Sequence, residues 1–174
     1  MMRIHTKLGL PARLATAALA LALLPLTAAH AQAPLRQIEG RLLEQFAPAT
    51  LAGHPLVDPM TGRVAGARRL VQPGGVEAAY GLEGGAYANL SFGNTYGRTP
   101  YIIEACEEWE PIGAHRACVS TATERVSLRW AFSQRVMVTL AAPDRATAVR
   151  LARALPLDEI AAFVARTPGT ALGQ

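Results

Sequence analysis

Lysine is almost absent from this chain, and cysteine and aromatic residues are sparse. Lys7 is the only lysine among 174 residues, Cys106 and Cys118 are the only cysteines, and aromatic residues make up 6% of the sequence. Two cysteines exclude a disulfide-dense scaffold, and 15 glycines without a regular period exclude a collagen-like chain. Because 51% of the residues are apolar, the chain is not wholly disordered and can form the core of one domain.

The sequence also lacks an apolar run of the roughly 20 residues that a membrane-spanning helix needs. An uncharged stretch runs only from Leu14 to Ala29 and contains Pro25. A basic, acid-free segment (1–13) precedes it, and Ala29-His30-Ala31 follows. These parts are typical of a secretory signal peptide. We therefore expect Sec-type export, cleavage of residues 1–31 after Ala31, and no stable membrane insertion of the remaining chain. The final location would be periplasmic or secreted.

Most of the formal net charge belongs to this leader. The whole chain has a net charge of +4, but without residues 1–31 there are 14 arginines against 13 acidic residues, a balance of about +1. A near-neutral chain gives no electrostatic reason to expect a nucleic-acid partner or an anionic membrane surface. The expected partner is instead a protein or small ligand of the cell envelope.

Cys106 and Cys118 are expected to form a disulfide. Both follow the predicted leader, no third thiol competes, and an exported protein meets an oxidising compartment. Closing a loop of this length contributes roughly 3 kcal/mol in the chain-entropy model. A redox or metal site is the alternative, but eleven intervening residues match neither C-x-x-C nor a zinc knuckle.

The middle of the chain alternates apolar and polar residues with the period of a β-strand. We expect one hairpin from the runs 76–82 and 86–92 around Gly84-Gly85, and a second from 126–132 and 136–140 turning near Ser133 and Gln134. The segments 101–105 and 117–122 are expected to be further strands. The Gly pair could instead begin a phosphate-binding loop, but such a loop opens onto a helix and here a strand follows.

The two ends of the chain have helical periodicity. Apolar residues at steps of three and four predict an N-terminal helix within 32–50, ended by Pro48. Asp144 and Asp158 are expected to cap two C-terminal helices. Strands followed by helices without βα alternation predict an α+β fold, with a twisted antiparallel sheet of hairpins packed against these three helices. We expect a single domain over 32–166 and a flexible tail over 167–174.

Four carboxylates surround Cys106, and His115 lies nearby. Glu104, Glu107, Glu108 and Glu110 could bind a cation or a basic partner, but they lack the alternating ligands and bend glycine of a calcium loop. A nearby Glu with His115 could perform acid/base catalysis. H-E-x-x-H and G-x-S-x-G motifs are missing, so no catalytic residue, metal ligand or cofactor site is assigned.

The residues we single out as a binding surface lie between 94 and 116. Tyr96, Arg98, Tyr101, Trp109 and His115 combine aromatic rings with an arginine and an imidazole beside the expected disulfide. Such groups on loops of a rigid sheet are frequent at recognition sites, although tyrosines at hairpin ends also cover the edge of a core.

Three hypotheses follow for the function. The first is a small exported envelope protein that acts as a non-catalytic binding or accessory module. The second is a periplasmic hydrolase that uses His115 with a nearby Glu. The third is an inhibitor-like structural accessory of an envelope assembly. Under the binding hypothesis, reduction of the disulfide weakens partner capture if the 94–116 surface is the site.

Overall fold

The computed structural model describes residues 36–95, 100–122 and 124–171, and these residues belong to one unit that spans Ala33–Gln174. Its framework is a nine-stranded sheet in which every pair of neighbouring strands is antiparallel. The strands are β2 (Thr50–Leu51), β3 (His54–Val57), β4 (Leu70–Gln72), β5 (Gly75–Gly81), β6 (Tyr87–Asn94), β7 (Trp109–Ile112), β8 (His115–Ala122), β9 (Arg125–Phe132) and β10 (Val136–Ala142).

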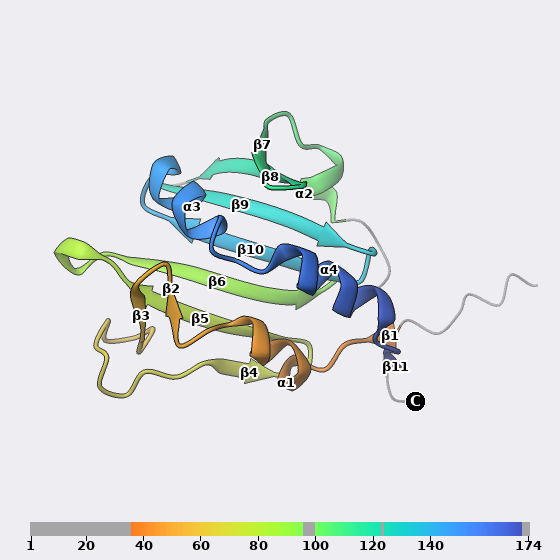
Figure 1. Ribbon diagram of the computed structural model, residues 1–174, viewed down its shortest axis with the longest axis horizontal. Helices are drawn as coiled ribbons and strands as arrows, with labels where there is room; N and C mark the ends of the chain where they lie inside the picture. The colour runs from red at the N-terminus through yellow and green to blue at the C-terminus, as the bar shows by residue number, and fades with distance from the viewer. Residues whose placement is uncertain (1–35, 96–99, 123, 172–174) are drawn as a thin grey trace, which may run out of the picture. The chain divides into compact units, whose positions relative to one another are not determined.

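The strand order is β2-β3-β5-β6-β10-β9-β8-β7, and β4 pairs with β5 beside β3. The two halves of the sheet meet where β6 pairs with β10 (Figure 1). The helical segments are α1 (Gly40–Leu43), the 3-10 turn η1 (Glu44–Phe46), the 3-10 turn η2 (Glu83–Gly85), α2 (Tyr101–Glu104), α3 (Arg145–Ala152) and α4 (Leu157–Arg166). The mixed α+β class with an antiparallel sheet is therefore as predicted.

The two predicted hairpins are present. β5 and β6 are joined through η2, where Gly84 and Gly85 have φ values of 70° and 78°. β9 and β10 are joined at Ser133 and Gln134, with φ values of 50° and 52°. Positive φ at both central positions is the geometry of a type I′ turn, whose twist matches that of the flanking strands.

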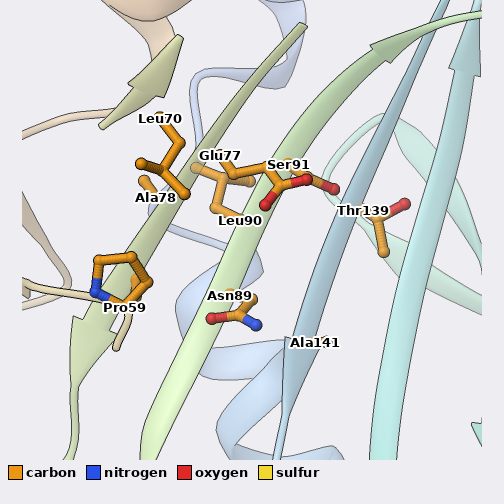
Figure 2. A pocket seen from close by; sticks show the side chains of 10 residues that line it. Pro59, Leu70, Glu77, Ala78, Asn89, Leu90, Ser91, Thr139 and Ala141 are labelled. Carbon is orange, nitrogen blue, oxygen red and sulfur yellow. The ribbon is translucent and has the colours of Figure 1, made fainter. Parts of the chain in front are cut away.

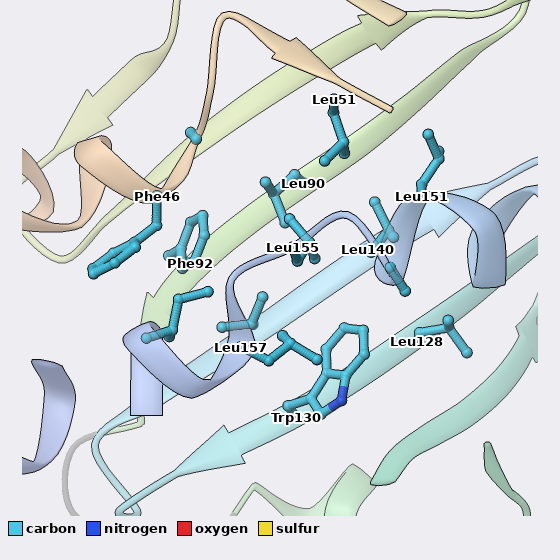
Figure 3. Packing of buried hydrophobic residues seen from close by; sticks show 14 of the residues in the cluster. Phe46, Leu51, Leu90, Phe92, Leu128, Trp130, Leu140, Leu151, Leu155 and Leu157 are labelled. Carbon is cyan, nitrogen blue, oxygen red and sulfur yellow. The ribbon is translucent and has the colours of Figure 1, made fainter. Parts of the chain in front are cut away.

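The core lies between the sheet and the helices on one of its faces. α1, α3 and α4 lie over the same face (Figure 1), and their apolar side chains join those of the strands in one buried cluster. Trp130 of β9 and Leu140 of β10 lie beneath Leu151 and Leu157 of the two helices (Figure 3). Burial of this apolar area contributes roughly 25 cal/mol per Å².

The N-terminal helix is shorter than predicted. The α-helical residues span Gly40–Leu43, and Leu42, one of the apolar residues at helical spacing, is 41% exposed. Asn94 of β6 explains the shortening, because its side chain accepts a hydrogen bond from the amide of Ile38 and donates one to the carbonyl of Ile38, both at 2.8 Å. The backbone groups of Ile38 are thus used by a strand 56 residues away rather than by a helix.

The prediction of a strand over residues 101–105 is wrong, because Tyr101–Glu104 forms the helix α2. Its first turn is closed by the carbonyl of Pro100, which accepts bonds from the amides of Ile103 and Glu104. The acidic segment that follows α2 contains strand β7.

Of the two predicted helix caps, Asp144 is confirmed and Asp158 is wrong. Asp144 precedes α3 and accepts a hydrogen bond from the amide of Thr147 at 2.8 Å. At α4 the capping position is Pro156, and Asp158 lies in the first turn, where its carboxylate binds another side chain described below.

The last described strand, β11 (Thr170–Ala171), pairs with β1 (Arg36–Gln37) in a separate two-stranded sheet. The predicted tail begins at Thr167 in the α4 cap position and includes β11, while residues 172–174 lie outside the described residues. The predicted leader (1–31) also lies outside them. The flexibility of the tail and the cleavage of the leader stay predictions.

Candidate functional site

Of the residues that sequence analysis grouped as one surface, the structure places Trp109 and His115 on opposite faces of the sheet. Tyr96 and Arg98 lie outside the described residues. Tyr101 lies on α2 and is 80% exposed, while Trp109 and His115 lie on the paired strands β7 and β8. Trp109 lies opposite Cys118, and His115 lies opposite the buried residue Ile112. Since successive strand residues point to opposite faces, Trp109 and His115 face opposite sides of the sheet.

Cys106 and Cys118 form the expected disulfide, with their Cα atoms 5.8 Å apart. It connects the segment after α2 to β8. The Sγ atom of Cys118 lies 3.4 Å from the carbonyl oxygen of Ile102, so α2 lies against the sheet at this strand. Beside it, the guanidinium of Arg116 lies 5.1 Å from the ring centroid of Trp109, within the range of a cation-π interaction.

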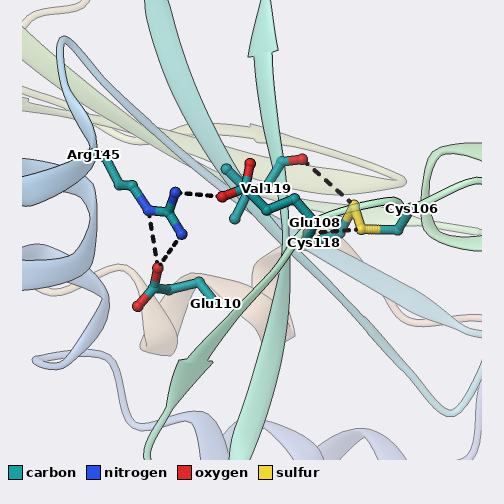
Figure 4. A network of polar contacts seen from close by, with 6 residues as sticks. All are labelled: Cys106, Glu108, Glu110, Cys118, Val119 and Arg145. Carbon is teal, nitrogen blue, oxygen red and sulfur yellow. Dashed lines mark hydrogen bonds and ion pairs between the residues drawn. A yellow bond between two sulfur atoms is a disulfide. The ribbon is translucent and has the colours of Figure 1, made fainter.

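Two of the four acidic residues have a structural partner. Arg145 of α3 donates two hydrogen bonds to Glu110, at 2.7 and 3.0 Å, and one to Glu108 (Figure 4). These contacts with Glu110 and then Glu108 raise the pKa of the Arg145 guanidinium. The acidic segment therefore ties β7 to α3. Among the described residues, no group of three His, Cys, Asp or Glu side chains is placed to hold a metal ion.

His115 lies on the helix-covered side of the sheet. Its Nε2 atom lies 2.8 Å from Asp158 Oδ1 in the first turn of α4, and its ring meets Phe132 edge-on at 5.6 Å between centroids. The pair borders a cleft of about 480 Å³. The side chains that line this cleft include Arg153 and Glu159 but no serine, threonine or cysteine. Acid/base chemistry at His115 would therefore have to act on water or on a substrate group directly.

The opposite side of the sheet, away from α1, α3 and α4, is here called the outer face. A single row of residues crosses it from β5 to β7, because each residue is the direct partner of the next in the strand register. The row is Glu77, Ser91, Thr139, Arg129, Cys118 and Trp109. Directly opposite residues lie about 4.5–5.5 Å apart, so the polar side chains of this row are neighbours.

A cavity of about 250 Å³ lies on the outer face over β5, β6 and β10. Its polar side chains are Glu77, Asn89, Ser91 and Thr139, and Pro59 and Leu70 line it from outside the row (Figure 2). Within the described part of the chain, none of these four polar side chains has a hydrogen-bond or ion-pair partner. The cavity therefore presents four polar side chains with free donors and acceptors among six apolar lining residues, and such a mixture is typical of ligand sites.

Sequence reasoning missed this cavity. The signal was present in the polar residues that alternate with the core residues of the two hairpins, which include Asn89 and Ser91 in one and Arg129 and Thr139 in the other. Alternation of apolar and polar residues is typical of any sheet with one solvent-exposed face. Only the pairing of β6 with β10 unites the two polar sets in one site.

Comparisons of the chain with models of protein families, with curated proteins and with solved structures find no match. Over the residues that the structure describes, no helix is both long and apolar enough to span a bilayer. The function is therefore argued from the site alone, since a fold does not by itself define an activity.

Proposed function

We propose that this protein is an exported, non-catalytic binding protein whose ligand lies on the outer face of the sheet. The observation that carries the proposal is the cavity over β5, β6 and β10, with four polar side chains that have no partner in the described part of the chain. Free polar groups in a concave surface favour a ligand that supplies the complementary donors and acceptors.

The proposed location is the periplasm or the extracellular medium. The disulfide between Cys106 and Cys118 supports it, because disulfides persist in oxidising compartments. The composition of residues 1–31 supports it independently, since a basic start, an apolar stretch and small residues at alternate positions are the elements of a signal peptide.

The test is to purify the oxidised protein from its native envelope and identify what it retains by native mass spectrometry. Ser91→Trp places a large side chain between Glu77 and Thr139 and is expected to abolish retention. Thr121→Trp, at an exposed position of β8 outside the cavity, is the control and should retain the same ligand. The double variant Asn89→Ala/Ser91→Ala removes polar groups without adding bulk and covers the case in which Ser91→Trp does not fold.

The proposal fails if the wild-type protein retains nothing, or if the folded cavity variants retain the same ligand as the wild type. Circular dichroism of each variant separates loss of binding from loss of fold. Loss of retention on Tyr101→Ala or Trp109→Ala, with none on the cavity variants, would instead place the ligand on the 94–116 surface.

A periplasmic hydrolase is the second candidate function, and the hydrogen bond between His115 and Asp158 at the border of a cleft favours it. The partner of the imidazole is Asp158 instead of a nearby Glu. Hydrolysis of ester or peptide substrates that His115→Ala abolishes would support this candidate over the binding protein.

A further inference from the structure

Arg129 is an arginine of the outer face whose side chain has no partner among the residues that the structure describes. It lies in the middle of β9, between Thr139 of β10 and Cys118 of β8. Its Nη1 atom is buried and makes no hydrogen bond. No ion pair or ring contact of Arg129 exists within the described residues either. Since buried polar groups in folded proteins are nearly always hydrogen-bonded, this one requires an explanation.

Three other arginines of the sheet bind other parts of the chain, although Arg125 Nε and Arg135 Nη2 are, like Arg129 Nη1, buried without a hydrogen bond. Arg116 stacks on Trp109, and Arg125 stacks on Tyr87 and donates to two backbone carbonyls. Arg135 donates to the carbonyls of Val164 and Thr167. These contacts have structural roles, because each joins two segments of the chain. The side chain of Arg129 makes no such contact within the described residues.

The acidic residue of the same row is too far away to neutralise Arg129. Glu77 lies three strands along the row, about 14 Å away at roughly 4.8 Å for each strand. The residues between them, Thr139 and Ser91, carry hydroxyl groups, and both line the cavity. Arg129 is therefore the direct strand partner of a hydroxyl residue of the cavity, although it is not itself among the residues that line the cavity, and no carboxylate of the described chain is bound to it.

We propose that Arg129 anchors an oxyanion of the ligand, a carboxylate or a phosphate group, with the hydroxyl of Thr139 as the adjacent donor. The planar fork of a guanidinium matches the paired oxygens of either group, and such charge-assisted hydrogen bonds are among the strongest in proteins. The rest of the ligand extends from this anchor into the cavity towards Ser91 and Asn89. This inference rests on the proposed binding function and specifies the chemistry of the ligand.

The test uses the oxidised protein as it is purified from its native envelope and two probes, sodium acetate and inorganic phosphate, against sodium chloride at matched ionic strength. NMR follows the backbone amides of Arg129 and Thr139 and the Nε–Hε group of Arg129. We expect saturable shifts at these groups. Stronger binding of acetate identifies a carboxylate, and stronger binding of phosphate identifies a phosphate ligand.

Arg129→Gln is expected to weaken the binding of the preferred probe by about tenfold or more, because a hydrogen bond to a charged group is lost. Arg129→Lys keeps the charge but loses the fork and should show an intermediate loss. Arg116→Gln, on the same face but stacked on Trp109, is the matched control and should bind as the wild type does. In chloride buffer, the thermal unfolding midpoint of Arg129→Met should be no lower than that of the wild type, because the Arg129 side chain makes no hydrogen bond or ion pair that the substitution would remove.

Shifts that do not saturate, or that persist unchanged in Arg129→Gln, would overturn the oxyanion site. A clear loss of stability in Arg129→Met would assign Arg129 a structural role and also overturn it. The outcome remains separable from that of the proposed function. If Ser91→Trp loses the native ligand while Arg129→Gln retains it, the cavity binds a ligand but Arg129 is not its anchor.

Discussion

Gly75 of β5 and Gly93 of β6 lie directly opposite each other in the sheet, yet only one of them is sterically obliged to be glycine. A Cβ atom on Gly75 would lie 2.2 Å from the carbonyl oxygen of Phe92, whereas a Cβ atom on Gly93 would meet nothing within 4 Å. Gly75 also receives α1, because a Cβ atom on Gly40 would lie 2.1 Å from the carbonyl oxygen of Gly75. The backbone of the N-terminal helix thus approaches β5 closely at Gly75, and Gly40 permits this approach because it has no side chain.

Gly75→Ala is therefore expected to destabilise the protein by about 1–3 kcal/mol, because the backbone of β5 must shift away from β6. Gly93→Ala is the matched control and should be neutral or stabilising by up to about 1 kcal/mol, since alanine restricts the unfolded chain. Urea unfolding of both variants measures the difference. Equal effects of the two substitutions would contradict the packing described for Gly75.

The Asp144 cap predicts a pH-dependent contribution to stability. The hydrogen bonds from the amide and then the hydroxyl of Thr147 lower the pKa of the Asp144 carboxyl below its usual value of 3.8. A pKa that is lower in the folded than in the unfolded chain stabilises the fold above about pH 4, and this contribution is lost as the pH falls through the lowered value.

We therefore expect Asp144→Asn to melt at a lower temperature than the wild type at neutral pH, because the side chain still caps α3 but carries no charge. The two melting temperatures should converge as the pH falls below the lowered pKa of Asp144. Glu107→Gln, at an exposed position, is the control and should show no such convergence. A difference that stays constant from pH 7 to pH 2 would exclude the Asp144 charge as its source.

The His115–Asp158 pair is expected to contribute little to stability. The side chain of Asp158 is 86% exposed and that of His115 is 23% exposed, and ion pairs in such positions are typically worth less than about 1 kcal/mol. Asp158→Asn should therefore unfold within about 1 kcal/mol of the wild type in urea. It should also retain the ligand of the outer face, since the pair lies on the other side of the sheet. A variant that stays folded but loses the ligand would move the site to the His115 cleft.

The strands of the two hairpins could be predicted because their signals are local. Val76, Tyr80, Leu90 and Phe92 recur with a period of two, and the structure buries all four. The turn at Ser133 and Gln134 was predicted from the change between two alternating runs rather than from its own residues, which are not the usual choice for positive φ.

The errors at α1 and α2 arise from contacts that are distant in sequence. Helical periodicity around Ile38 is overruled by Asn94, which binds both backbone groups of Ile38. Alternation alone does not show that Tyr101 lies in a helix closed by Pro100 rather than in a strand, because a short apolar run fits both periods. Sequence proximity also does not show that Trp109 and His115 lie on opposite faces, because residues close in sequence can point to opposite sides of a sheet.

The amino-acid sequence by itself determined the alternating strands, the Asp144 cap and the pairing of Cys106 with Cys118, because each depends on neighbouring residues or on the absence of a competing thiol. Only the tertiary structure decided where the polar side of each strand lies. Ser91 and Thr139 belong to different hairpins, and they become direct partners because β6 pairs with β10. Strand order is a property of long-range hydrogen bonding and shared burial, which no local pattern of residues encodes.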